Sequence, residues 1–173
     1  MDVFIEQLVK KKQTAADFAK KAAIVLGCIA LPIAVMACVY INFYLFYIGL
    51  FLIPFSAYFG WYMFGFVNLE FEYIVTNSTL TIDKILGQRR RKRLIKIDIH
   101  DIKALELNAN DGKLENERYA KVVEAAKTQK GTDRCAAAVF NNTFGNTLIV
   151  FSPDERTLEA MKPFLSPTVR RGL

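Results

Sequence analysis

The chain has 173 residues, of which 53% are hydrophobic and 23% charged, and it carries a formal net charge of +6 at pH 7. This positive excess is too small for a domain that coats nucleic acid, so the composition argues against a nucleic-acid partner. Three cysteines at wide spacing give no disulfide framework, which favours a domain facing the reducing cytosol.

Residues 1–21 form a basic N-terminal segment with five lysines and three acids. Val3, Phe4 and Leu8 fall on one side of a helix, which predicts an amphipathic segment lying on the inner leaflet of a membrane. Packing of this segment on a soluble domain explains the pattern equally well, and both alternatives stay open. Thr14 followed by an acid at the third helical position, Asp17, predicts that a long helix begins there.

Residues 22–67 contain no Asp, Glu, Lys, Arg or His over 46 positions. One helix needs about 20 apolar residues to cross a bilayer, so the run predicts two spans, Ala22–Ile41 and Phe43–Val67, joined at Asn42. Basic residues precede the first span and follow the second, whereas the connection has none. The positive-inside rule therefore predicts a multi-pass protein of the plasma membrane with both termini cytoplasmic.

Aromatic residues and prolines in this hairpin indicate which positions lie at the membrane interfaces and which lie near the middle of the membrane. Two clusters, one at the connection and one near the exit of the second span, are candidate interface aromatics: Tyr40, Tyr44, Tyr47, Tyr58, Trp61 and Tyr62. Pro32 and Pro54 are candidate kinks at similar depth, where each frees a backbone carbonyl. These kinks are explained either by ordinary helix packing or by a hinge that senses the state of the bilayer.

From residue 68 onward the helical period gives way to alternation, which predicts a cytosolic domain over residues 68–173 with 18 Lys or Arg against 14 acids. Residues 108–113 are expected to be loop, and the region 110–134 is otherwise undetermined. The expected strands are Leu69–Val75, Thr79–Leu86, a third that ends at Ile99, Ile102–Leu107, Tyr119–Ala125 (with a helix as the alternative), and a final hairpin of Cys135–Phe140 and Thr147–Phe151.

A helix is expected after the last strand. Ser152 is a suitable N-cap and Pro153 suits the first helical position, while Pro163 limits the length of the helix. About seven antiparallel strands followed by one amphipathic helix is the order of a small barrel with a C-terminal capping helix. The predicted fold class is therefore a membrane α-helical hairpin plus an all-β or α+β barrel.

Several of these segments resemble a known family. The stretch Phe71–Asp83, followed by a glycine turn, basic residues and Ile95–Ile102, is similar to the opening of bacterial PH-like domains that follow a membrane hairpin. The ending Phe151–Leu158 with Ser166–Arg170 resembles a family of small bacterial membrane proteins of this length. The resemblance implies a PH-like barrel and no catalytic residue, and its strand and turn motifs carry little information on function.

No arrangement of residues in the chain predicts catalysis or metal binding. His100 is the only histidine and has no partner ligand at the spacing of a zinc site. Neither a nucleophile with its base nor a glycine-rich phosphate loop is visible. We therefore expect no catalytic residue, no metal ligand and no cofactor.

The basic run Arg89, Arg90, Arg91, Lys92 and Arg93 is the candidate set of lipid-headgroup contacts. Two strands that leave the membrane and return place the turn at Gly87 near the bilayer, so the run is expected to begin close to anionic headgroups. Orientation of the domain on the membrane, a solvated basic strand, and a specific ligand are the three interpretations.

The sequence therefore predicts a non-enzymatic integral membrane protein that presents a PH-like interaction domain at the inner leaflet. Its expected partners are membrane lipid and an unidentified protein, and self-association through the aromatic second span is left open. The alternative function is a sensor of anionic lipid or of membrane state that uses the run from Arg89 to Arg93.

Overall fold

The computed structural model describes residues 3–107, 114, 117–128, 133–141 and 145–170. Two compact units divide the chain. The helical unit comprises Gln13–Leu69 together with Leu86–Arg89, and the β unit comprises Met1–Lys12, Glu70–Ile85 and Arg90–Leu173. The expected loop at residues 108–113 lies outside the described residues. Each unit is described by itself.

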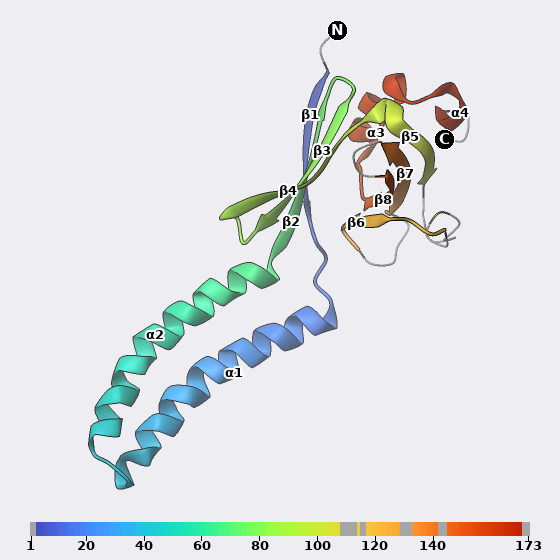
Figure 1. Ribbon diagram of the computed structural model, residues 1–173. Coiled ribbons are helices and arrows are strands. Elements are labelled where there is room, and N and C mark those ends of the chain that lie inside the picture. The colour runs from blue at the N-terminus through green and yellow to red at the C-terminus, as the bar shows by residue number, and fades with distance from the viewer. Residues whose placement is uncertain (1–2, 108–113, 115–116, 129–132, 142–144, 171–173) are drawn as a thin grey trace. The chain divides into compact units, whose positions relative to one another are not determined.

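Two long helices, α1 (Ala15–Ala37) and α2 (Tyr44–Val67), run side by side in the helical unit (Figure 1). A short 3₁₀ turn, η1 (Cys38–Tyr40), follows α1. Both helices are long and apolar enough to cross a membrane. The expected start at Thr14 is confirmed, since the backbone N–H of Thr14 donates to Asp17 Oδ2 at 3.1 Å in a capping box. The helix therefore begins before the span expected from Ala22.

Small residues bring the two helices together. A Cβ on Gly49 would lie 2.2 Å from the Met36 side chain, and one on Gly60 would lie 3.0 Å from the Cys28 sulfur. Close approach of this kind is how helices associate where water supplies no hydrophobic driving force. The outer surface of the pair is apolar and exposed, as at Leu26 (67%) and Phe51 (78%).

The β unit contains two four-stranded sheets among the described residues. The first has the order β1-β2-β3-β4 and the second the order β5-β7-β8-β6 (Figure 1). The strands of the first sheet are β1 (Phe4–Lys10), β2 (Leu69–Thr76), β3 (Thr79–Leu86) and β4 (Arg90–Asp98). The 3₁₀ turn η2 (Ile99–Asp101) leads into the second sheet, formed by β5 (Ile102–Leu107), β6 (Lys121–Ala125), β7 (Cys135–Asn141) and β8 (Gly145–Phe151).

Residues Phe4–Lys10 form a strand that packs on the β unit, so of the two alternatives the packing on the soluble domain is confirmed and the amphipathic helix is wrong. β1 pairs antiparallel with β2 and places Val9 opposite Phe71. The side chain of Gln7 points inward, where its amide donates to the Ser152 carbonyl at 3.2 Å and accepts from the Asp154 amide at 2.9 Å. Because the inward residue Gln7 is polar, the sequence of this segment does not show the alternation of apolar and polar residues that is typical of a strand. Pairing with β2 is what makes the segment a strand.

The second sheet departs from the expected antiparallel barrel in one pairing. Lys121–Ala125 is a strand rather than a helix, and β6 pairs parallel with β8, with Val123 opposite Ile149. Eight strands are present among the described residues where about seven were expected. The hydrogen-bonded ladders of these residues form two separate sheets rather than a closed ring.

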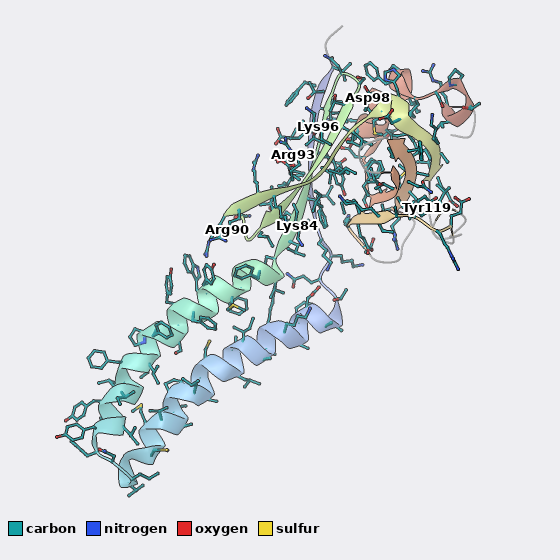
Figure 2. All side chains as sticks on the ribbon, viewed as in Figure 1. Lys84, Arg90, Arg93, Lys96, Asp98 and Tyr119 are labelled. Atoms are coloured by element: carbon teal, nitrogen blue, oxygen red, sulfur yellow. The ribbon has the colours of Figure 1, made fainter. Side chains whose placement is uncertain are left out.

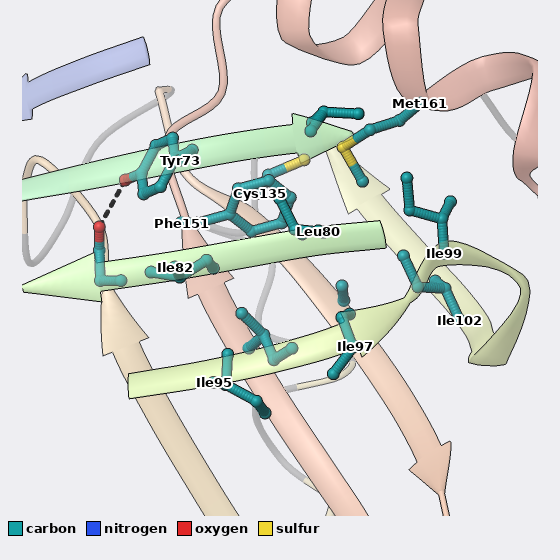
Figure 3. Close-up of a cluster of buried hydrophobic side chains, with 14 of the residues drawn as sticks. Tyr73, Leu80, Ile82, Ile95, Ile97, Ile99, Ile102, Cys135, Phe151 and Met161 are labelled. Carbon is teal, nitrogen blue, oxygen red and sulfur yellow. Dashed lines mark hydrogen bonds between the residues drawn. The ribbon is translucent and has the colours of Figure 1, made fainter. Parts of the chain in front are cut away.

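The core of the β unit lies between the two sheets (Figure 3). Ile82 and Ile97 from the first sheet and Phe151 from the second are all buried there. Tyr73 is fully buried, packs edge-on against the Phe151 ring, and joins the sheets through its hydroxyl. That hydroxyl donates to the Ala125 carbonyl and accepts from the Ser152 amide, so β2 is tied to the ends of β6 and β8.

The C-terminal helix α3 (Glu155–Met161) is capped by Asp154, whose carboxylate accepts from the Thr157 amide at 2.8 Å. The expected cap at Ser152 is wrong, because the Ser152 hydroxyl accepts from the Lys127 amide at 3.0 Å instead. As expected, Pro163 lies where α3 ends, in the 3₁₀ turn η4 (Lys162–Phe164). A short helix, α4 (Pro167–Arg170), follows.

Candidate functional site

The basic run begins at the end of the turn between β3 and β4. The backbone N–H of Arg89 donates to the Leu86 carbonyl at 3.0 Å, and both central residues have positive φ, 54° at Gly87 and 59° at Gln88. Two consecutive left-handed residues define a turn of type I′, in which glycine is favoured. The sequence therefore places a tight turn directly before Arg90.

This turn packs against the last turns of α2. A Cβ on Gly87 would lie 2.5 Å from the Gly65 Cα and 2.8 Å from its carbonyl oxygen. The Gly87 amide also donates to the Asn68 carbonyl at 3.0 Å. Two facing glycines thus allow backbone-to-backbone contact, and any side chain at Gly87 would separate them.

Arg89 lies over the face of Trp61, with its guanidinium carbon 3.6 Å from the ring centroid. Tyr58 lies one turn earlier on α2, with its ring 5.9 Å from that of Trp61. A cation on the face of an indole is attracted by the ring quadrupole. Arg89 is therefore held at the end of α2 among residues typical of a membrane interface.

Arg91 and Arg93 reach acids on neighbouring strands. Arg91 Nη1 lies 3.0 Å from Glu72 Oε2, and Arg93 Nε lies 3.2 Å from Asp83 Oδ1. Glu72 is 1% exposed, although it follows the alternation of β2 onto the face opposite the core residue Tyr73. These two arginines therefore pair with carboxylates that are buried in the folded domain.

Burial raises the pKa of Glu72, and the neighbouring acids Glu6 and Asp83 raise it further. Arg91 acts in the opposite direction, because a nearby cation favours the ionised carboxylate. Ionising the Glu72 carboxyl is therefore unfavourable, and the positive charge of Arg91 offsets part of this unfavourable free energy. A third pair, Lys10 with Glu70 at 3.7 Å, lies on the same side of the sheet.

Arg90 and Lys92 are exposed and make no ion pair within the part of the chain that the structure describes. They alternate along β4 with Arg91, and Figure 2 shows Arg90 and Arg93 on this strand. The five basic residues of the run therefore divide into one that stacks on an aromatic ring, two that pair with acids, and two that have no ion-pair partner among the described residues.

The other predicted residues lie along the helices. Tyr40, Tyr44 and Tyr47 lie at and just after the connection between α1 and α2, and all three are exposed. Tyr62 lies near Trp61 in α2 and packs edge-on against Phe66. The two prolines differ in surroundings, since Pro32 is buried with its carbonyl facing Gly49, whereas Pro54 is exposed.

His100 and Cys135 form no catalytic arrangement with the other residues that the structure describes. The His100 ring contacts Asp98 at 2.6 Å, but the nearby Ser78 hydroxyl bonds to that carboxylate at 3.4 Å and not to the imidazole, so a nucleophile activated by histidine is not formed. Burial raises the pKa of the Cys135 thiol to about 12. No group of three potential metal ligands is present among the described residues.

Sequence reasoning missed the buried acids of the first sheet. Glu70 and Glu72 alternate with the core residues Phe71 and Tyr73 in β2, a pattern normally typical of a solvated face. The only signal of their burial in the sequence is the run of arginines on β4. These arginines lie two strands away in the sheet and can pair with buried carboxylates.

Two mostly antiparallel sheets and a C-terminal helix are consistent with a PH-like domain, and a pair of candidate membrane helices is inserted between its first two strands. The chain belongs to the bacterial PH-like domain family DUF6106, whose profile matches residues 1–171. The family resemblance expected from the strand and turn patterns is thereby confirmed. No match was found among curated proteins or among solved structures.

Proposed function

We propose that this protein is a non-enzymatic membrane anchor that holds a PH-like domain at the inner leaflet, where the domain contacts another protein. The exposed apolar surface of α1 and α2 carries this proposal. Helices that form the core of a soluble protein are buried, whereas Leu26, Ile33 and Phe51 are each more than half exposed. Lipid is the environment that such a surface requires.

The orientation follows from charge. Lysines precede α1 and the basic run follows α2, while the connection between the helices is uncharged. Both termini are therefore cytoplasmic in this proposal, and the protein is multi-pass. The absence of any charge within residues 22–67 gives no support to an ion pathway through the hairpin.

A contact with a protein is supported by apolar side chains on the outer surface of the β unit. Phe4 (65%) and Leu8 (52%) are exposed on the same face of β1, and Phe140 at the end of β7 is also exposed. Exposed aromatic and aliphatic residues of this size are enriched at protein interfaces. The PH-like fold supports a binding role rather than a catalytic one.

The proposal is tested with the full-length chain in cells. We expect it to stay in the membrane after alkaline carbonate washing. In a background without native cysteines, Asn42→Cys in the connection should react with an impermeant maleimide from outside, and Lys103→Cys on β5 only after permeabilisation. Extraction by carbonate, or the reverse labelling pattern, would refute the anchor or its orientation.

Anionic-lipid sensing is a second candidate function, and it is favoured by the exposed side chains of Arg90 and Lys92, which make no ion pair among the described residues. In this case the domain reads the charge of the leaflet to which it is anchored. It differs from the first candidate in needing no protein partner.

A further inference from the structure

We propose that the basic run is divided by function: Arg90 and Lys92 bind the phosphates of anionic lipids, whereas Arg91 and Arg93 neutralise buried acids inside the domain. This inference rests on the proposed membrane anchoring, and it assigns the lipid contact to two residues of the five. Alternation along the strand already divides the five between two faces, but the sequence does not tell which face meets buried acids.

The internal pair is identified by what it touches. Arg91 lies 3.0 Å from Glu72, and Arg93 donates a hydrogen bond to Asp83 at 3.2 Å. Both acids are less than 10% exposed, so each would be an uncompensated buried charge without its arginine. A cation held by a buried acid has already lost most of its attraction for a lipid phosphate.

The external pair is identified by its exposure and by the lack of an ion-pair partner among the described residues. Arg90 and Lys92 are two positions apart in β4, so their side chains leave the same face of the strand about 7 Å apart. Both are exposed, and neither has an ion-pair partner among the described residues. Figure 2 shows the Arg90 side chain near the start of β4.

The chain before Arg90 is held at the depth of an interface. Arg89 stacks on Trp61 and Gly87 packs on Gly65, both near the end of α2. Tryptophan in a membrane helix lies at the level of the headgroups. Because consecutive Cα atoms are about 3.8 Å apart, Arg90 begins within reach of the same level.

Charge then sets the size of the effect. A lysine or arginine near an anionic leaflet favours binding by about fivefold, so the two free cations together give about 25-fold. Screening lowers this preference, because the Debye length falls from about 10 Å at 0.1 M salt to about 3 Å at 1 M. The predicted preference is therefore moderate and sensitive to salt.

The test uses the full-length chain in vesicles, with its single tryptophan, Trp61, as the probe. Phosphatidylcholine vesicles receive increasing amounts of either brominated phosphatidylcholine or brominated phosphatidylglycerol, and quenching of Trp61 gives the preference for the anionic lipid. Arg90→Gln with Lys92→Gln is compared with Lys96→Gln with Lys103→Gln, a control that removes the same charge from two other exposed positions.

We expect the wild-type chain and the control to prefer the anionic lipid at low salt, and the Arg90/Lys92 variant to lose most of that preference. An equal loss in the two variants, or a wild-type chain without preference, overturns the inference. Failure of the anchor itself is distinguishable, because Trp61 would then not be quenched by either brominated lipid.

Discussion

Replacing Arg91 by Gln removes the cation that faces Glu72, the most buried acid among the residues that the structure describes. Glu72 is 1% exposed, and the substitution removes the guanidinium that lies 3.0 Å from its carboxylate. Breaking a fully buried ion pair costs about 3–5 kcal/mol. The Arg91 side chain is itself 64% exposed, so solvent screens one half of the pair and we expect a loss of about 2 kcal/mol.

The companion variant Glu72→Gln separates loss of charge pairing from loss of packing. Removing the carboxylate leaves Arg91 free to turn into solvent, so this change alone is expected to be nearly neutral. Arg91→Gln combined with Glu72→Gln should recover most of the lost stability, because neither charge is then buried.

The loss in Arg91→Gln is also expected to depend on pH. The folded-state pKa of Glu72 is raised, so the associated stability is fully present below the unfolded-state pKa and is lost as pH rises through the folded-state value. Arg91 lowers this pKa, and its removal enlarges the shift. The variant should therefore be weakest near neutral pH and approach wild type as the pH is lowered.

Cys135 provides the assay. Its thiol is 2% exposed and has its pKa raised to about 12, so it reacts with a thiol reagent only when the domain opens. With Cys28 and Cys38 replaced by Ala, a loss of 2 kcal/mol corresponds to about 30-fold faster labelling under equilibrium opening. Unchanged labelling in Arg91→Gln, or no recovery in the double variant, would refute the assignment of Arg91 to the buried acid.

Two further changes probe the elements that hold the site. Tyr73→Phe leaves the backbone carbonyl and amide that its hydroxyl joins without their partner, so we expect a loss of about 2–4 kcal/mol, measured by the same thiol labelling. Gly87→Ala places a Cβ 2.5 Å from the Gly65 Cα at a positive φ, and should move the turn away from α2. A shift in Trp61 emission would report that movement, and an unchanged spectrum would contradict the packing.

The division of the basic run has a physical logic beyond this chain. A strand alternates its side chains between two faces, so a continuous run of cations is split between them. At β4 one set meets acids of the sheet, such as Glu72, and the other set meets solvent. Mutating the whole run at once would therefore confuse loss of folding with loss of binding.

Local patterns in the sequence were sufficient for the helices α1, α2 and α3, the strands β2 to β5 and the turn at Gly87. A run of residues without charge identifies a candidate membrane hairpin because burying even one charge in hydrocarbon is costly. Alternating isoleucines such as Ile95 and Ile97 identify a half-buried strand, and the glycine that follows Leu86 identifies a tight turn. These features depend on neighbours within a few residues.

Tertiary structure alone decided β1, the parallel pairing of β6 and the roles of individual cations. Phe4–Lys10 is a strand because β2, some sixty residues later, offers it hydrogen bonds and a place for Gln7. Arg91 differs from Arg90 only because Glu72 lies across the sheet. Contacts between distant segments leave no local pattern, so only the folded chain shows which cations of the basic run meet acids and which remain exposed.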